Sequence, residues 1–137
     1  MVSRREFVLN GIAVSALPLV AGDVSGRNLG DAWRELGATP IYKVIYDQRF
    51  PASVHYGQEA RRRGFVVQAI RGDMTDLWFH DLQPRWQKAP VAIAGLTAHG
   101  PLFCLERLSW DFGMRVASRD RRPDELISWI IAPRRRA

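Results

Sequence analysis

The chain has 137 residues and a formal net charge of +6, and arginine far outnumbers lysine among its 20 basic residues. Its single cysteine, Cys104, excludes an internal disulfide bond, so the fold must depend on its apolar core. The basic residues form short separate clusters, which argues against a nucleic-acid-binding protein. These clusters cover residues 61–63, 119–122 and 134–136.

The first 22 residues have the pattern of an export signal. Arg4 and Arg5 precede Phe7, and the apolar stretch that follows is too short to span a bilayer comfortably. The segment resembles a twin-arginine (Tat) signal peptide, with Arg4, Arg5 and Phe7 as its signal residues. The alternative is that the arginine pair begins a cytosolic amphipathic helix, but the stretch after it has hardly any polar face.

The resemblance implies that the protein folds in the cytoplasm and is carried to the periplasm by the Tat translocase. We expect cleavage before Asp23, which leaves no stable transmembrane segment. A retained signal would instead tether the protein to the inner membrane. Tat passengers often carry a cofactor or assemble with a partner before export, so the resemblance also suggests a periplasmic enzyme subunit as partner.

Removing 22 residues from 137 leaves 115, a length typical of one domain. We expect a lead-in segment over residues 23–40 and an α/β domain over residues 41–137. Within the lead-in, a short helix is predicted over residues 31–36, ended by Gly37.

Strands and helices alternate in the rest of the chain. Strands are predicted at 41–46, 65–70 and 90–96, helices at 51–63, from Asp73 to Pro84 and at 100–112, and two final strands at 114–118 and 126–132. This order predicts a small single α/β domain, with three βα units in a mainly parallel sheet and a C-terminal β-hairpin at its edge.

Ligands of open α/β sheets bind beyond the carboxyl ends of the strands, where helix N-termini also point. Polar residues follow all three predicted βα strands, and their arginines and backbone N–H groups suit a carboxylate or phosphate. The candidate ligand-binding residues are Asp47, Arg49, Arg71, Asp73, Thr97 and His99. The alternative is that the aspartates cap helices and pair with the arginines, while the hydroxyl groups stabilise turns. No P-loop or Gly-x-Gly-x-x-Gly pattern follows a strand, so nucleotide binding is not indicated.

Cys104 near the start of a helix, with His99 close in sequence, has the elements of a nucleophile and its base. The alternative, which burial statistics favour, is that Cys104 is a small core residue. His55, His80 and His99 have no metal-binding spacing, so no metal site is predicted, and the sequence assigns no cofactor.

The chain is rich in large aromatic residues, of which Trp86 and Trp129 are candidates for an exposed partner-binding patch. The alternative is that both cover the faces of the sheet. The functional hypothesis is an exported binding or accessory protein of the periplasm that serves a redox enzyme, the redox association coming from the Tat resemblance. The alternative is a small enzyme that uses His99 with Cys104 or an aspartate.

Overall fold

The computed structural model describes residues 29–134, so the predicted export signal with Arg4, Arg5 and Phe7 lies outside the described residues. In chain order the elements are α1 (Leu29–Ala38), β2 (Ile41–Asp47), α2 (Pro51–Arg62), β3 (Val67–Ile70), α3 (Thr75–Leu77), the π-helical turn η1 (Trp78–Leu82), α4 (Gln83–Lys88), β4 (Ala92–Thr97), α5 (His99–Ser109), η2 (Trp110–Phe112), β5 (Met114–Arg121), η3 (Pro123–Glu125) and β6 (Ile127–Pro133). Among these described elements, no helix is long and apolar enough to span a membrane.

Five strands form one mixed sheet in the order β3-β2-β4-β6-β5. β2 runs parallel to β3 and β4, whereas β6 runs antiparallel to β4 and β5. The prediction of a small single α/β domain is therefore confirmed. The finer prediction of three βα units in a mainly parallel sheet is wrong, because two of the four strand pairings are antiparallel.

Burial explains why β6 lies inside the sheet and β5 lies at its edge. Every residue of β4 is buried, so this strand needs neighbours on both sides. β6 has four consecutive buried residues, Ser128 to Ile131, and suits the place beside β4. β5 alternates between covered and exposed residues and carries arginines outward, as an edge strand should.

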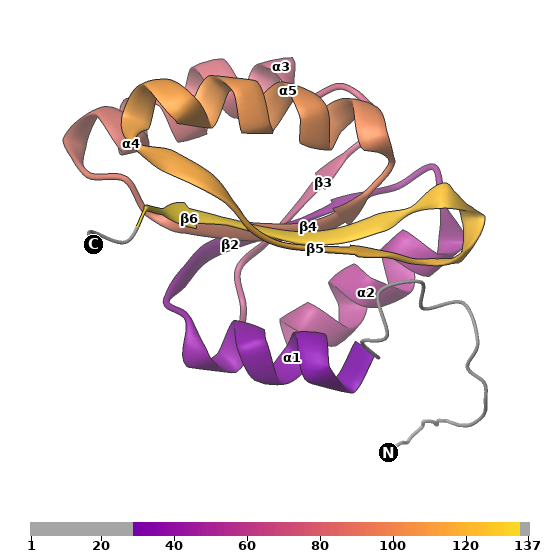
Figure 1. Cartoon of the computed structure of the whole chain (residues 1–137). Helices are drawn as coiled ribbons and strands as arrows, with labels where there is room; N and C mark the ends of the chain where they lie inside the picture. Colours follow the sequence, from indigo (N-terminus) through magenta and orange to yellow (C-terminus); the bar gives the residue numbers. More distant parts are fainter. Residues whose placement is uncertain (1–28, 135–137) are drawn as a thin grey trace.

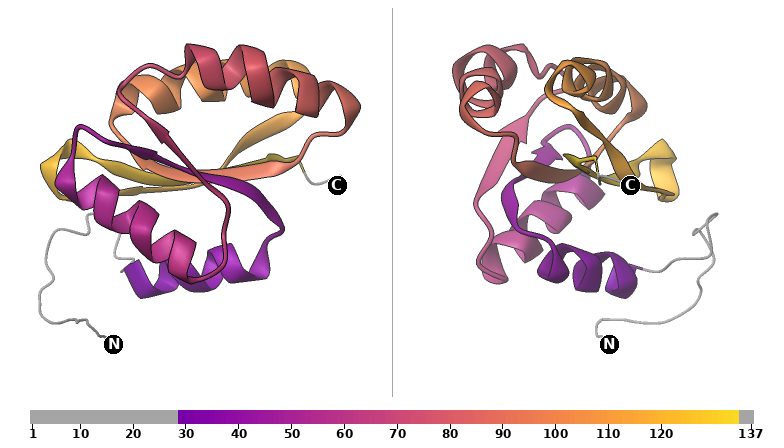
Figure 2. Two further views of the ribbon diagram at one scale, coloured as in Figure 1. Left: turned by 180° about the vertical axis from the view of Figure 1, so that it is seen from behind. Right: turned by 60° about the vertical axis from the view of Figure 1, so that its left-hand side comes forward.

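Helices cover both faces of the sheet (Figure 1). α1 and α2 lie on one face, and the α3–η1–α4 segment and α5 lie side by side on the other, which the rotated views also show (Figure 2). Each face has its own apolar cluster. The cluster beneath α5 contains Trp78, Trp86 and Trp129, and the cluster beneath α1 and α2 contains Trp33 and Tyr56.

The aromatic residues are mostly core. Trp86 and Trp129, the candidates for an exposed patch, are each 2% exposed, and Trp86 packs edge-to-face on Trp78 and Phe112. The alternative interpretation, that they cover the faces of the sheet, is confirmed.

The lead-in segment contributes to this core. The predicted helix over residues 31–36 is present as the longer α1, whose Trp33 stacks on Tyr56 at 5.0 Å between ring centroids. Leu36 on the same helix is 2% exposed. Residues 29–38 therefore form part of the folded unit.

The prediction that Pro84 ends the second helix is wrong. Pro84 lies at the start of α4, and the chain enters α4 directly from the π-helical turn η1. A proline ring clashes with the carbonyl group four residues earlier and has no N–H to donate, so a regular α-helix cannot pass through it. The wider π turn accommodates the ring, and the helical segment continues to Lys88.

Candidate functional site

The parallel strands β2, β3 and β4 end at the same edge of the sheet, so their following loops meet there. We call this region the strand-end site. The carboxylate of Asp47, at the end of β2, is completely buried. It accepts hydrogen bonds from the backbone N of Arg49 at 3.0 Å, from Nε at 3.0 Å and from Nη2 at 2.7 Å.

The Arg49 guanidinium also lies against the loop after β3. A Cβ atom added to Gly72 would lie 2.4 Å from Cζ of Arg49, and Gly72 has a φ of +84°. The backbone conformation therefore favours glycine here, and the absence of a side chain leaves room for the guanidinium. Asp47 raises the pKa of Arg49 by accepting its hydrogen bonds, so the two side chains form an ion pair within the loop that follows β2.

The buried hydroxyl groups of the strand-end site have partners within the fold. Ser53 Oγ donates to the carbonyl oxygen of Leu96 at 2.5 Å and accepts from the backbone N of Asp47 at 2.7 Å. Thr97 Oγ1 accepts a hydrogen bond from Nε1 of Trp129 at 3.0 Å. These hydroxyl groups join the ends of neighbouring strands to one another.

The other predicted ligand-binding residues lie at the surface of the same edge. Asp73 accepts hydrogen bonds from Oγ1 of Thr75 at 2.6 Å and from its backbone N at 2.9 Å, and the side-chain bond is the main reason why the pKa of Asp73 is lowered. Arg71 and His99 are exposed. Arg71 has no hydrogen bond or ion pair to any residue of the described range. The structure thus joins Asp47 with Arg49 but does not bring Arg71, Asp73 and His99 into contact with that pair or with one another.

The predicted pair of His99 and Cys104 is not brought together. Both residues lie on α5, and five residues along an α-helix turn the side-chain direction by about 140°. The ring that His99 contacts is that of Phe103, at 5.8 Å between centroids. Cys104 is exposed, so the alternative interpretation of a core cysteine is wrong as well. The apolar neighbours Phe103 and Leu105 suggested a buried cysteine, but of these two only Leu105 is buried, and Phe103 faces outward.

A group of exposed residues that sequence reasoning missed runs along the outer face of α5. His99, Phe103, Arg107 and Trp110 follow one another at helical spacing within about 80° of the helix circumference. We call this set the α5 stripe. Phe103 is 46% exposed and Trp110 50%. The Arg107 guanidinium lies over both rings, at 5.7 Å from the centroid of Phe103 and 4.9 Å from that of Trp110.

The sequence did contain a signal for the α5 stripe. Leu102, Leu105 and Ser109 form the buried side of α5 at the spacing of an amphipathic helix. An amphipathic helix should be polar on its other side, but this helix has aromatic residues there. Aromatic residues on the side of a helix opposite to its buried side can be recognised from the sequence alone, and they indicate an exposed apolar surface.

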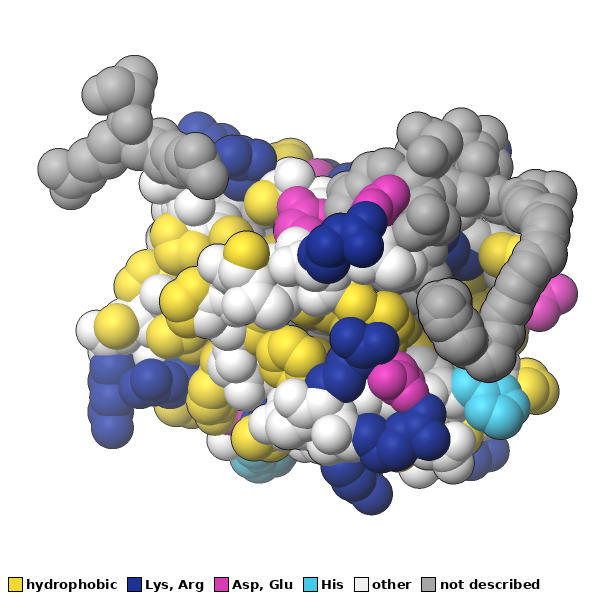
Figure 3. Space-filling model, turned by 90° about the horizontal axis from the view of Figure 1, so that it is seen from below, with side chains coloured by type: hydrophobic (Ala, Val, Ile, Leu, Met, Phe, Trp, Pro, Cys, Tyr) yellow, Lys and Arg dark blue, Asp and Glu magenta, His cyan; other side chains and the backbone are white. Residues whose placement is uncertain are grey.

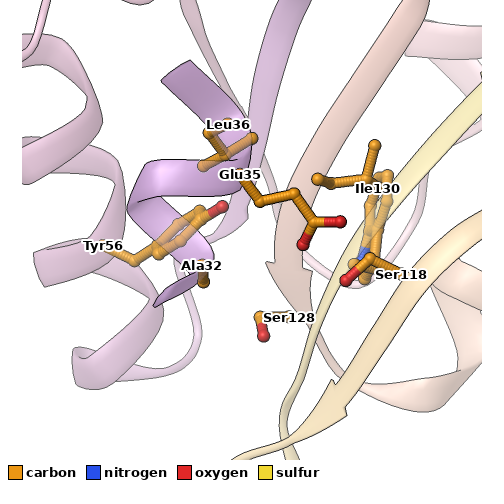
Figure 4. A pocket seen from close by; sticks show the side chains of 8 residues that line it. Ala32, Glu35, Leu36, Tyr56, Ser118, Ser128 and Ile130 are labelled. Atoms are coloured by element: carbon orange, nitrogen blue, oxygen red, sulfur yellow. The ribbon is translucent and has the colours of Figure 1, made fainter. Parts of the chain in front are cut away.

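A small cavity and the surface charge limit the other kinds of site. A cavity between α1 and strands β5 and β6, lined by Glu35, Tyr56, Ser118 and Ser128 among others, has a volume of only about 10 Å³, enough for one water molecule (Figure 4). On the face that carries α1 and α2, basic side chains are scattered among acidic and apolar ones (Figure 3). Within residues 29–134, no three His, Cys, Asp or Glu side chains are grouped to hold a metal ion.

Comparisons of the chain with protein families, with curated proteins and with solved structures find no match.

Proposed function

We propose that the protein is a small binding or accessory protein of the periplasm, exported by the Tat route, that docks on a partner protein through the α5 stripe. The stripe is the single observation that carries this proposal. Large aromatic side chains held half exposed on a helix cost free energy in water, at about 25 cal/mol for each Å² of apolar surface. Covering them with a partner recovers that free energy, and exposed apolar surface of this kind typically marks an interface.

The composition of the stripe favours a protein partner with acidic groups. Tryptophan, phenylalanine and arginine are enriched in the centres of protein interfaces. Arg107 lies between the two rings and offers N–H donors in a planar array that suits a carboxylate. The proposed partner therefore presents acidic side chains beside an apolar surface, and the Tat resemblance suggests a periplasmic redox enzyme.

The alternative of a small enzyme has less support. A base must lie within hydrogen-bond reach of the group that it deprotonates. His99 is exposed and its described contact is with Phe103, while Cys104 projects in another direction on α5. Cys104 lies outside the α5 stripe, so a Cys104→Ala variant should fully complement a deletion strain, and loss of complementation by this variant would favour the enzyme.

An anion-binding role of the strand-end site is the second component of the proposal. Arg49 already donates hydrogen bonds from Nε and Nη2 to Asp47, so few of its N–H groups remain for an external anion. Arg71 retains its donors, and neither α2 nor α5 has a side-chain cap at its N-terminus. An anion at this edge would thus contact Arg71 and backbone N–H groups. Arg71→Ala should abolish any protection of the protein against thermal unfolding by phosphate.

The docking proposal is tested by recovering tagged protein from periplasmic extracts. The wild-type protein should emerge with a partner in defined stoichiometry, and Phe103→Ser with Trp110→Ser should emerge alone. Val66→Ser is the matched control, because Val66 is also an exposed apolar side chain, at 60%, and lies outside α5. Recovery of a monomeric wild-type protein, or equal loss of the partner in the control, would contradict the proposal.

The export component is tested separately by fractionation. Replacement of Arg4 and Arg5 by lysine should leave the protein in the cytoplasm, since the Tat resemblance depends on the arginine pair. An unchanged distribution between cytoplasm and periplasm would remove the periplasmic assignment, whatever the α5 stripe binds.

A further inference from the structure

A groove of about 380 Å³ opens between strands β2 and β3 and the α3–η1 segment that covers them. Its volume lies within the range of small-ligand sites. The groove contains no residue of α5 or of the strand-end site. Its lining residues are Lys43, Gln68, Asp76, Leu77, His80 and Asp81.

The floor of the groove is a network of polar side chains. Lys43 forms an ion pair with Asp81, and the two side chains are only 18% and 21% exposed. Tyr42 donates a hydrogen bond to Oδ1 of Asp81 at 2.6 Å, and Nζ of Lys43 donates to Oε1 of Gln68 at 3.2 Å. Charged groups held in this way are preorganised for a ligand.

These contacts shift the pKa values of Asp81 and Tyr42. Burial acts to raise the pKa of Asp81, but the hydrogen bonds from Lys43 and Tyr42 outweigh it, so the pKa lies below its ordinary value. The same hydrogen bond raises the pKa of Tyr42 and keeps its hydroxyl a donor. One oxygen of Asp81 accepts the hydrogen bond from Tyr42, and the other forms the ion pair with Lys43.

Three groups of the groove retain hydrogen-bonding capacity for a ligand. The ammonium group of Lys43 has three N–H donors, of which Gln68 and Asp81 engage two. Asp76 and His80 stand four residues apart on the rim, both exposed, and neither has a hydrogen bond or ion pair within residues 29–134. The groove thus offers a donor on its floor and two acceptors on its rim.

We propose that this groove binds a small primary amine that carries an oxygen acceptor close to the ammonium group, as α-amino acids and amino alcohols do. The ammonium group donates to Asp76 and to an imidazole nitrogen of His80, while the oxygen accepts the remaining N–H of Lys43. The lining has one cationic and two anionic side chains, which favours a ligand with an ammonium group over a simple anion.

The test is a titration of ¹⁵N-labelled protein with glycine, ethanolamine and acetate at about pH 8. Glycine and ethanolamine should produce saturable shifts of the backbone amide signals around the groove, and acetate should not. Asp76→Asn should weaken glycine binding by about tenfold, because it removes the charged acceptor without breaking a contact of the fold. Asp111→Asn, an exposed aspartate of η2 outside the groove, is the matched control and should bind glycine as the wild type does.

The proposal is overturned if neither amine gives a saturable shift, or if acetate binds as tightly as glycine. It is equally overturned if Asp76→Asn and Asp111→Asn bind glycine with the same affinity. His80→Gln gives a second readout on the rim and should weaken binding less than Asp76→Asn does, since it removes no charge.

Discussion

Replacement of Thr97 by valine should destabilise the protein although the two side chains have nearly the same shape. Thr97 is completely buried, and its Oγ1 accepts the hydrogen bond from the indole N–H of Trp129, which is 2% exposed. Valine leaves that donor buried without an acceptor, which costs about 1 to 3 kcal/mol. The expected loss of about 2 kcal/mol corresponds to about a 30-fold change in the folding equilibrium. It is a large part of the roughly 5 to 15 kcal/mol that stabilises a typical domain.

The measurement is urea unfolding followed by far-UV circular dichroism, which does not depend on the fluorescence of Trp129 itself. Thr97→Ser keeps the hydroxyl and should cost less, about 1 kcal/mol for the lost methyl group. Thr39→Val is the control, because the Thr39 hydroxyl donates to a carbonyl oxygen at a partly exposed site where water replaces it. The reasoning fails if Thr97→Val unfolds at the same urea concentration as the wild type, or if Thr97→Ser is as unstable as Thr97→Val.

Three further outcomes are expected. Gly72→Ala should destabilise the protein by about 1 to 2 kcal/mol in urea, because its φ of +84° strains any other residue; unchanged stability would contradict the left-handed conformation of this position. The pKa of Asp81 is lowered in the folded protein, so its contribution to stability is complete above about pH 4 and is lost as the pH falls further. Asp81→Asn should therefore flatten the dependence of Tm on acid pH. Parallel curves of Tm against pH for the two proteins would refute this. The thiol of Cys104 should react with a thiol reagent in the native protein, and reaction only after unfolding would show that it is buried.

Local patterns predicted most elements of this fold. Apolar and β-branched runs gave all five strands, and the left-handed Gly113, with a φ of +70°, follows the helical segment that was expected to end at it. Which of the last two strands pairs with the rest of the sheet was harder to predict. A hairpin can add to an edge by either strand, and only the continuous apolar run of β6 indicates that this strand lies next to β4.

Side-chain partners were harder to predict than elements. The contact of Asp47 with Arg49 spans two residues and was foreseen among the alternatives. The contacts of Thr97 with Trp129 and of Tyr42 with Asp81 span 32 and 39 residues, and no local pattern specifies them. The sequence therefore shows that Asp76, His80 and Asp81 are close to one another along the chain, but it does not predict that Lys43 and Tyr42 contact Asp81.

Two local irregularities produce the groove, and they act together. The register between β2 and β4 shifts between Ile41 and Lys43, and such a bulge redirects a side chain, so that Tyr42 and Lys43 both reach Asp81. On the facing segment, the π turn before Pro84 carries Asp81 itself. Tyr42 and Lys43 come from the bulged part of β2 and Asp81 comes from the π turn, so the polar network joins the two irregular segments across the groove.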